Sequence, residues 1–196
     1  TFCLRWIVAS FVLASAASLA MAVEPDAKKS AAVEAPAGET VDVFEAMKNK
    51  QIDVKFIAMS ATKANLVIEN KTKKPLTITI PDAVAGMPVL AQVDAGTQGV
   101  GGPAGGPFNI APEKTRKVEM PCVCLEHGKA DPYAKIPYEL KPIAALSDKP
   151  EVTALLVRYG KGDISAQVAQ AAAWHLQNGM SWQELAAKEI KDGRGL

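Results

Sequence analysis

The sequence predicts an α+β protein in which an antiparallel β-sandwich is followed by three C-terminal helices. From Ile52 onward, apolar residues alternate with polar ones in several short runs, as in strands with one buried face. After residue 148 the apolar spacing changes to three and four residues, which is typical of amphipathic helices. A short helix that begins at Thr40 is expected ahead of the strands, because apolar residues follow it at helical spacing.

The sandwich is expected over residues 40–145. A polar turn, with Pro75 at the entry of the second strand, predicts a hairpin in its first half. Residues 95–107, AGTQGVGGPAGGP, predict a flexible Gly/Pro loop. Pro137 and Pro142 place the last strand at a sheet edge, because proline cannot donate a ladder hydrogen bond. Strands are expected at 52–58, 66–69, 76–80, 87–93, 114–125 and 136–143.

Residues 146–196 are expected to form a helical segment that packs on the sandwich. Each helix has a start signal, and the second also has a stop signal at Asn178-Gly179. The first and third starts fit the capping box, in which a polar residue precedes a Glu by three positions. The residues expected to start the three helices are Asp148, Asp163 and Ser181.

The N-terminus predicts export. Arg5 precedes an uncharged apolar run, and Ala20-Met21-Ala22 supplies the small residues of a signal-peptidase site, so residues 1–22 fit a secretory signal peptide. The run is short for a membrane span, which needs about 20 apolar residues. Residues 23–39 are rich in Ala, Pro and charge and predict a flexible leader. We therefore expect a protein that is secreted, at the cell surface or in the periplasm, without a membrane span after cleavage.

Charge and motif content exclude several functional classes. The 22 Lys and Arg nearly balance the 21 Asp and Glu, so nothing in the net charge favours nucleic acid or an anionic membrane as partner. The hydrolase pattern Gly-x-Ser-x-Gly and the zinc-protease pattern His-Glu-x-x-His are both missing. We therefore expect no turnover enzyme and no cofactor.

Two cysteines, Cys122 and Cys124, remain after signal cleavage. They share one face of a strand, where a mutual disulfide would be strained, so two free thiols are expected in an oxidising compartment. With His127 they form a thiolate and imidazole set that suits copper(I) or zinc. A closed site would need a fourth ligand, for which His175 is the available histidine.

A second interpretation of Cys124 joins two distant segments. One is VCLEHGKADP, from Val123, and the other is QAAAWHLQNG, from Gln170. Together they resemble the thioester domains of bacterial surface adhesins. The resemblance implies an internal thioester between Cys124 and Gln170, with Trp174 as its shield, and a partner protein or surface ligand that carries an amine. Val123 departs from the family, which has an aromatic residue or Leu before the cysteine.

Two simpler interpretations stay open. The stretch ANLVIENKTKKPLTITIP resembles an Ig-like hairpin found in uncharacterised exported bacterial proteins, which implies a module that binds its partner without a covalent bond. In that case Cys122 and Cys124 are small core residues on an inward strand face, and Gln170 is a surface residue of a helix.

Overall fold

The computed structural model describes residues 38–89, 94–103 and 106–188. The predicted signal peptide (1–22), nearly all of the predicted leader and the end of the chain after residue 188 lie outside the described residues. Strands and helices both occur, so the α+β prediction is confirmed. Within the described part of the chain, no helix has the length and apolar character needed to cross a membrane.

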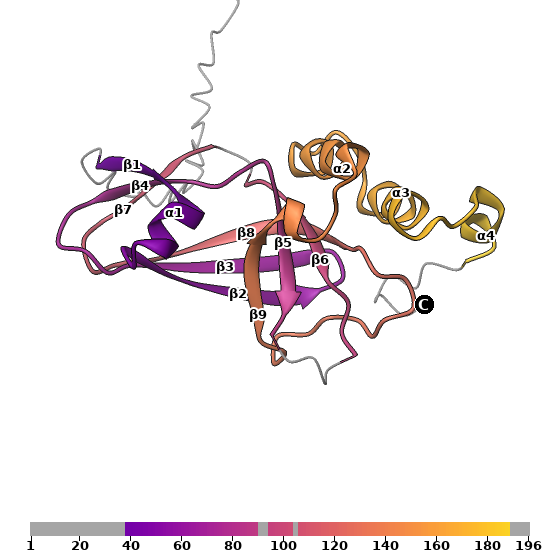
Figure 1. The fold of residues 1–196 in the computed structure, drawn as a ribbon, viewed down its shortest axis with the longest axis horizontal. Coiled ribbons are helices and arrows are strands. Elements are labelled where there is room, and N and C mark those ends of the chain that lie inside the picture. The colour runs from indigo at the N-terminus through magenta and orange to yellow at the C-terminus, as the bar shows by residue number, and fades with distance from the viewer. Residues whose placement is uncertain (1–37, 90–93, 104–105, 189–196) are drawn as a thin grey trace, which may run out of the picture. The chain divides into compact units, whose positions relative to one another are not determined.

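Six strands close into a barrel rather than stacking as the two layers of the predicted sandwich (Figure 1). The long strand Thr115–Cys124 has two neighbours on the barrel. Its residues 115–121 pair with residues 63–69, and its residues 122–124 pair with residues 98–100. Closure comes from a single pair, Phe56 with Tyr138. In order around the barrel, the strands are β2 (Ile52–Ser60), β3 (Lys63–Asn70), β8 (Thr115–Cys124), β6 (Gln98–Gly101), β5 (Ala83–Pro88) and β9 (Tyr138–Pro142).

The position of β9 differs from the predicted sheet edge. This strand pairs with β5 along its length and with β2 at Tyr138, and so it closes the barrel. Its prolines do not prevent this, because Pro137 precedes the strand and Pro142 is its last residue. The predicted strand 87–93 corresponds to the end of β5, and residues 90–93 lie outside the described residues.

A second sheet has three strands, in the order β1 (Glu39–Asp42), β4 (Leu76–Thr79) and β7 (Phe108–Ile110). The short N-terminal helix α1 (Val43–Lys48) is confirmed, but it begins after Asp42 rather than at Thr40. The Asp42 carboxylate accepts the Phe44 N–H at 2.8 Å and so caps the helix. Thr40 lies in β1, which runs parallel to β4.

The Gly/Pro stretch 95–107 contains strand β6, so the prediction of a flexible loop over its whole length is wrong. Its glycines allow close packing. A Cβ at Gly101 would lie 2.6 Å from the main chain of Gly160, and one at Gly99 would lie 3.0 Å from the Leu156 side chain. Both distances are too short for a side chain at these positions. Glycine therefore lets the helix that contains Leu156 and Gly160 pack directly on β6.

Three C-terminal helices are confirmed: α2 (Pro150–Gly160), α3 (Ala166–Asn178) and α4 (Trp182–Ala186), preceded by a 3-10 turn, η1 (Ile143–Ala145). The predicted starts of α2 and α3 are one and two residues too early, because the N-cap residues are Lys149 and Ser165. The Ser181–Glu184 capping box of α4 is present. Gly179 ends α3 in the left-handed region, with φ at 70°.

Two apolar clusters hold these elements together. One fills the barrel and continues to α1 and the small sheet. The other lies between the outer face of β8 and helices α2 and α3, and Figure 1 shows these two helices side by side. Side chains of β8 alternate between them: Cys122 belongs to the inner cluster, while Val123 belongs to the outer one. Because Val123 on the outer face packs with residues of α3, that helix lies beside the last residues of β8.

Candidate functional site

The carboxamide of Gln170 is hydrogen bonded on both sides to the main chain of Cys124. The Cys124 N–H donates to Gln170 Oε1 at 2.9 Å, and Gln170 Nε2 donates to the Cys124 carbonyl at 2.8 Å. Both bonds are buried, and Gln170 is only 6% exposed. The structure therefore brings together the two residues that the sequence analysis paired. Gln170 is not the surface residue that the simplest interpretation expects.

The register of β8 explains why its main chain needs a partner at Cys124. The Leu125 N–H donates to the carbonyl of Thr97, the residue before β6, so the adjacent pair, Cys124 with Gln98, is of the non-hydrogen-bonded type. The N–H and C=O of Cys124 consequently point away from β6, toward the edge that β3 occupies further back along β8. Because β3 begins at Lys63, its pairing with β8 stops at Pro121, and it does not reach Cys124.

Gln170 takes the place of the missing strand residue at this edge. A primary carboxamide offers the same donor and acceptor pair as a peptide group, and so it can complete the ladder. Ala169 and Ala173 pack with Val123 of β8 in the outer cluster, and their small side chains let α3 approach the strand. Without Gln170, a buried N–H and a buried C=O would lack partners, at a cost of about 1–3 kcal/mol each.

The Cys124 sulfur is held separately from the carboxamide. Its thiol donates to the Glu126 carbonyl at 3.2 Å. A Cβ on Gly96 would come within 2.7 Å of the sulfur, so glycine at that position leaves room for it. The thiol is free, so no disulfide holds the sulfur in this position.

Both thiols are neutral at neutral pH. Burial raises the pKa of the Cys122 thiol far above its ordinary range. Burial also raises the pKa of the Cys124 thiol, and the nearby Glu126 and Asp131 carboxylates raise it further, while hydrogen bonding by the Gln98 side chain opposes that rise. Cys124 therefore rests as a thiol rather than as a thiolate, and Cys122 is the less reactive of the two.

Trp174, the predicted shield, lies one turn beyond Gln170 on α3 and is half-buried. Its indole Nε1 is buried and has no hydrogen-bond partner among the described residues. The His127 ring contacts the indole edge-on, with ring centroids 4.9 Å apart. The main-chain N–H of His127 donates to Asn178 Oδ1 at 3.0 Å. The segment after β8 is thereby fixed to the same helix that carries Gln170.

The structure does not gather the predicted metal ligands. Within the described ranges, no group of three His, Cys, Asp or Glu side chains could hold a metal ion. The Cys122 thiol contacts the Ser60 carbonyl in the core, whereas His127 is exposed beside α3. His175 Nδ1 lies 2.6 Å from the Met180 carbonyl, at the C-terminal end of α3. The copper or zinc prediction therefore has no geometric support.

Three residues near the Cys124 sulfur, Gly96, Gln98 and Tyr138, were not identified as site residues from the sequence. Gln98 faces Cys124 across β6 and β8, and its side chain is fully buried. Gln98 Nε2 and the Tyr138 hydroxyl both donate to the Gly96 carbonyl, at 3.1 and 3.0 Å. A buried glutamine inside a glycine-rich stretch gives no periodic signal, and only the pairing of β6 with β8 reveals it.

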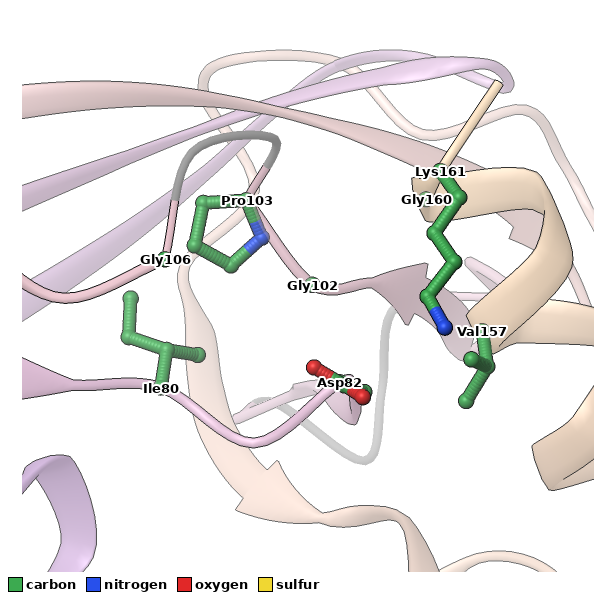
Figure 2. A pocket seen from close by; sticks show the side chains of 8 residues that line it. All are labelled: Ile80, Asp82, Gly102, Pro103, Gly106, Val157, Gly160 and Lys161. Atoms are coloured by element: carbon green, nitrogen blue, oxygen red, sulfur yellow. The ribbon is translucent and has the colours of Figure 1, made fainter. Parts of the chain in front are cut away.

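A separate cavity of about 210 Å³ lies between the C-terminal end of α2 and the segments that join β4 to β5 and β6 to β7 (Figure 2). Asp82 and Lys161 supply charged groups at its wall, and Ile80 and Val157 supply apolar ones. Neither Cys124 nor Gln170 lines this cavity, and so it does not belong to the candidate site.

Comparison with known proteins adds no relative. No family model, no curated protein and no solved structure matches this chain. The geometry of the site and the resemblance of its two motifs are therefore the grounds for a functional proposal.

Proposed function

We propose that this protein is an exported interaction protein that captures amine-bearing partners through an internal thioester between Cys124 and Gln170. The observation that carries the proposal is the buried contact between Gln170 and Cys124, with both ends of the carboxamide bound to the main chain of the cysteine. The two residues stand 46 positions apart in the chain, and both motifs of the resemblance meet at this contact.

The contact supports thioester formation in two ways. It fixes the carboxamide beside the residue that bears the nucleophile, which removes most of the entropic cost of the encounter. It also directs the Cys124 N–H at Gln170 Oε1, the oxygen on which negative charge would develop during attack on the carboxamide carbon. A donor already in place for that charge is the usual arrangement in acyl transfer.

The reaction balances without any cofactor. The Cys124 sulfur attacks Gln170 Cδ, the C–N bond breaks, and the thiol proton leaves with the amide nitrogen as ammonia. An amine of the partner then attacks the same carbon, an amide bond forms, and the C–S bond breaks to restore the thiol. Each molecule reacts once, and so this is capture rather than turnover. Trp174 and the buried position of Gln170 would keep water from the bond.

The second candidate is a module that binds its partner without a covalent bond. The observation that favours it is that the two Gln170 hydrogen bonds already account for the burial of this side chain. In that case Gln170 only completes the main-chain hydrogen bonds of β8, and Cys124 is a core residue.

Intact mass separates the two candidates. The protein, purified at neutral pH in a buffer free of amines, is expected to weigh one ammonia less than its sequence and to gain methylamine on incubation. Cys124→Ala should restore the full mass, because it removes the sulfur and leaves the main-chain contact with Gln170 in place. Cys122→Ala is the matched control and should keep the mass deficit. A full-length mass in the unchanged protein, with no methylamine uptake, would refute the thioester and leave the non-covalent module.

A further inference from the structure

A second glutamine, Gln98, lies at the Cys124 sulfur. The two residues are directly paired across β6 and β8 in a non-hydrogen-bonded pair, the type in which facing side chains are closest. Both are buried, with Gln98 0% and Cys124 6% exposed. The Gln98 side chain is also one of the groups whose hydrogen bonding acts on the Cys124 thiol. The sulfur therefore has its own carboxamide neighbour, distinct from Gln170.

The hydrogen bonding of Gln98 is incomplete. Its Nε2 uses one hydrogen on the Gly96 carbonyl at 3.1 Å, and its Oε1 is buried with no partner among the residues that the structure describes. A primary carboxamide has two N–H donors, and the bond to the Gly96 carbonyl uses only one of them. Burying an unsatisfied polar atom is costly, and such atoms recur where a site needs them for chemistry.

The thiol and the thiolate need different neighbours. As a thiol, Cys124 donates to the Glu126 carbonyl at 3.2 Å. As a thiolate it can only accept, and a carbonyl oxygen would then repel it. The Gln98 amide is a side-chain donor that lies beside the sulfur on the neighbouring strand β6.

We propose that Gln98 is a catalytic residue of the capture reaction, which donates a hydrogen bond to the Cys124 sulfur as it leaves Gln170 as a thiolate. This proposal rests on the proposed function. In the step concerned, the partner amine bonds to Gln170 Cδ and the C–S bond breaks. The electron pair goes to sulfur, and the amine proton then passes to the sulfur to restore the thiol.

The test compares the rate at which methylamine opens the thioester in the unchanged protein and in Gln98→Met, followed by intact mass over time. Met preserves length and removes the donor. We expect reaction about tenfold slower, since a hydrogen bond to a charged group is worth about one pKa unit or more. Gln177→Met is the control, because Gln177 binds Ser147 at 2.9 Å, away from the sulfur, and its replacement should leave the rate unchanged.

A second measurement reports on the sulfur itself. After methylamine treatment the Cys124 thiol is free, and its alkylation by iodoacetamide at one fixed pH, located by peptide mapping, should also be about tenfold slower in Gln98→Met. A residue that only stabilises the fold would not slow both reactions by a similar factor. If Gln98→Met does not fold, Gln98→Glu keeps the size of the side chain. Its carboxyl group would oppose the thiolate, so alkylation should again be slower.

The possible failures are distinguishable. Opening of the thioester at an unchanged rate in Gln98→Met would overturn the role of Gln98 and leave the thioester intact. A mass deficit that persists in Gln170→Met but disappears in Gln98→Met would make Gln98 the acyl donor and would also overturn the present assignment. A full mass in the unchanged protein would refute the proposed function, and with it the role of Gln98 in capture.

Discussion

Replacing Gln170 by Met in a Cys124→Ala background isolates the main-chain role of the glutamine. Without the sulfur no thioester can form, yet the N–H and C=O of residue 124 still need partners. Met has nearly the length of Gln and is an equally good helix former, and so the change removes only the polar end. The two hydrogen bonds, at 2.9 and 2.8 Å, are both lost.

The expected loss of stability follows from these two buried groups. Each unsatisfied group costs about 1–3 kcal/mol, and Met recovers part of this because the carboxamide itself is no longer desolvated. We therefore expect the free energy of unfolding to fall by about 2–4 kcal/mol. For a domain of this size that corresponds to a decrease in Tm of roughly 4–15 °C.

The assay is urea unfolding followed by circular dichroism, with midpoints compared at equal slope. Gln167→Met is the matched control, because Gln167 lies on the same helix and is exposed. It should change the stability by less than about 0.5 kcal/mol. If Gln170→Met costs no more than this control, the carboxamide does not complete the edge of β8, and the argument from strand register is wrong.

Three further predictions concern the barrel. Gly101→Ala should destabilise the protein by about 1–3 kcal/mol, because its Cβ would lie 2.6 Å from Gly160; an unchanged urea midpoint would contradict the close packing of α2 on β6. Asn70→Ala should cost about 2–4 kcal/mol, since this buried side chain donates to the Lys74 and Ile110 carbonyls; thermal unfolding near the unchanged Tm would argue against that network. Burial is the main reason that the pKa of Tyr138 is raised to about 12, and the nearby Cys124 adds to the rise. The stability that Tyr138 contributes is therefore complete below its pKa in the unfolded chain, about 10, and is lost as pH rises through about 12. Phenolate absorbance should show this late titration, and Tyr138→Phe should remove it.

Local patterns predicted the elements but not the closure of the sheet. Alternation places residues on one face of a strand and says nothing about which distant strand lies alongside. The single Phe56–Tyr138 pair closes the barrel between residues 82 positions apart. The glycines of 95–107 suggested flexibility because glycine favours loops. Here their missing side chains serve close packing, which depends on a helix some 50 residues further on.

The candidate site was predictable only in part. The sequence motifs paired Cys124 with Gln170, and the structure places the two residues in contact. The form of this contact could not be predicted, because it depends on β3 beginning only at Lys63, too late to pair with Cys124, which leaves the Cys124 main chain open. Gln98 was missed for a related reason: its importance comes from the β6–β8 register, and a glutamine among glycines is typical of an exposed turn.

The two roles of Gln170 can be separated by completing the double-mutant cycle with Cys124. With the sulfur present, Gln170→Met removes both the main-chain bonds and any covalent link, whereas in the Cys124→Ala background it removes the bonds alone. A covalent link across the 46 positions between them would stabilise the fold by about 4 kcal/mol through the entropy of the unfolded chain. The cost of Gln170→Met should therefore be larger by about 4 kcal/mol when Cys124 is present. Equal costs in the two backgrounds would mean that the carboxamide binds the main chain only, and covalent capture would have to be abandoned.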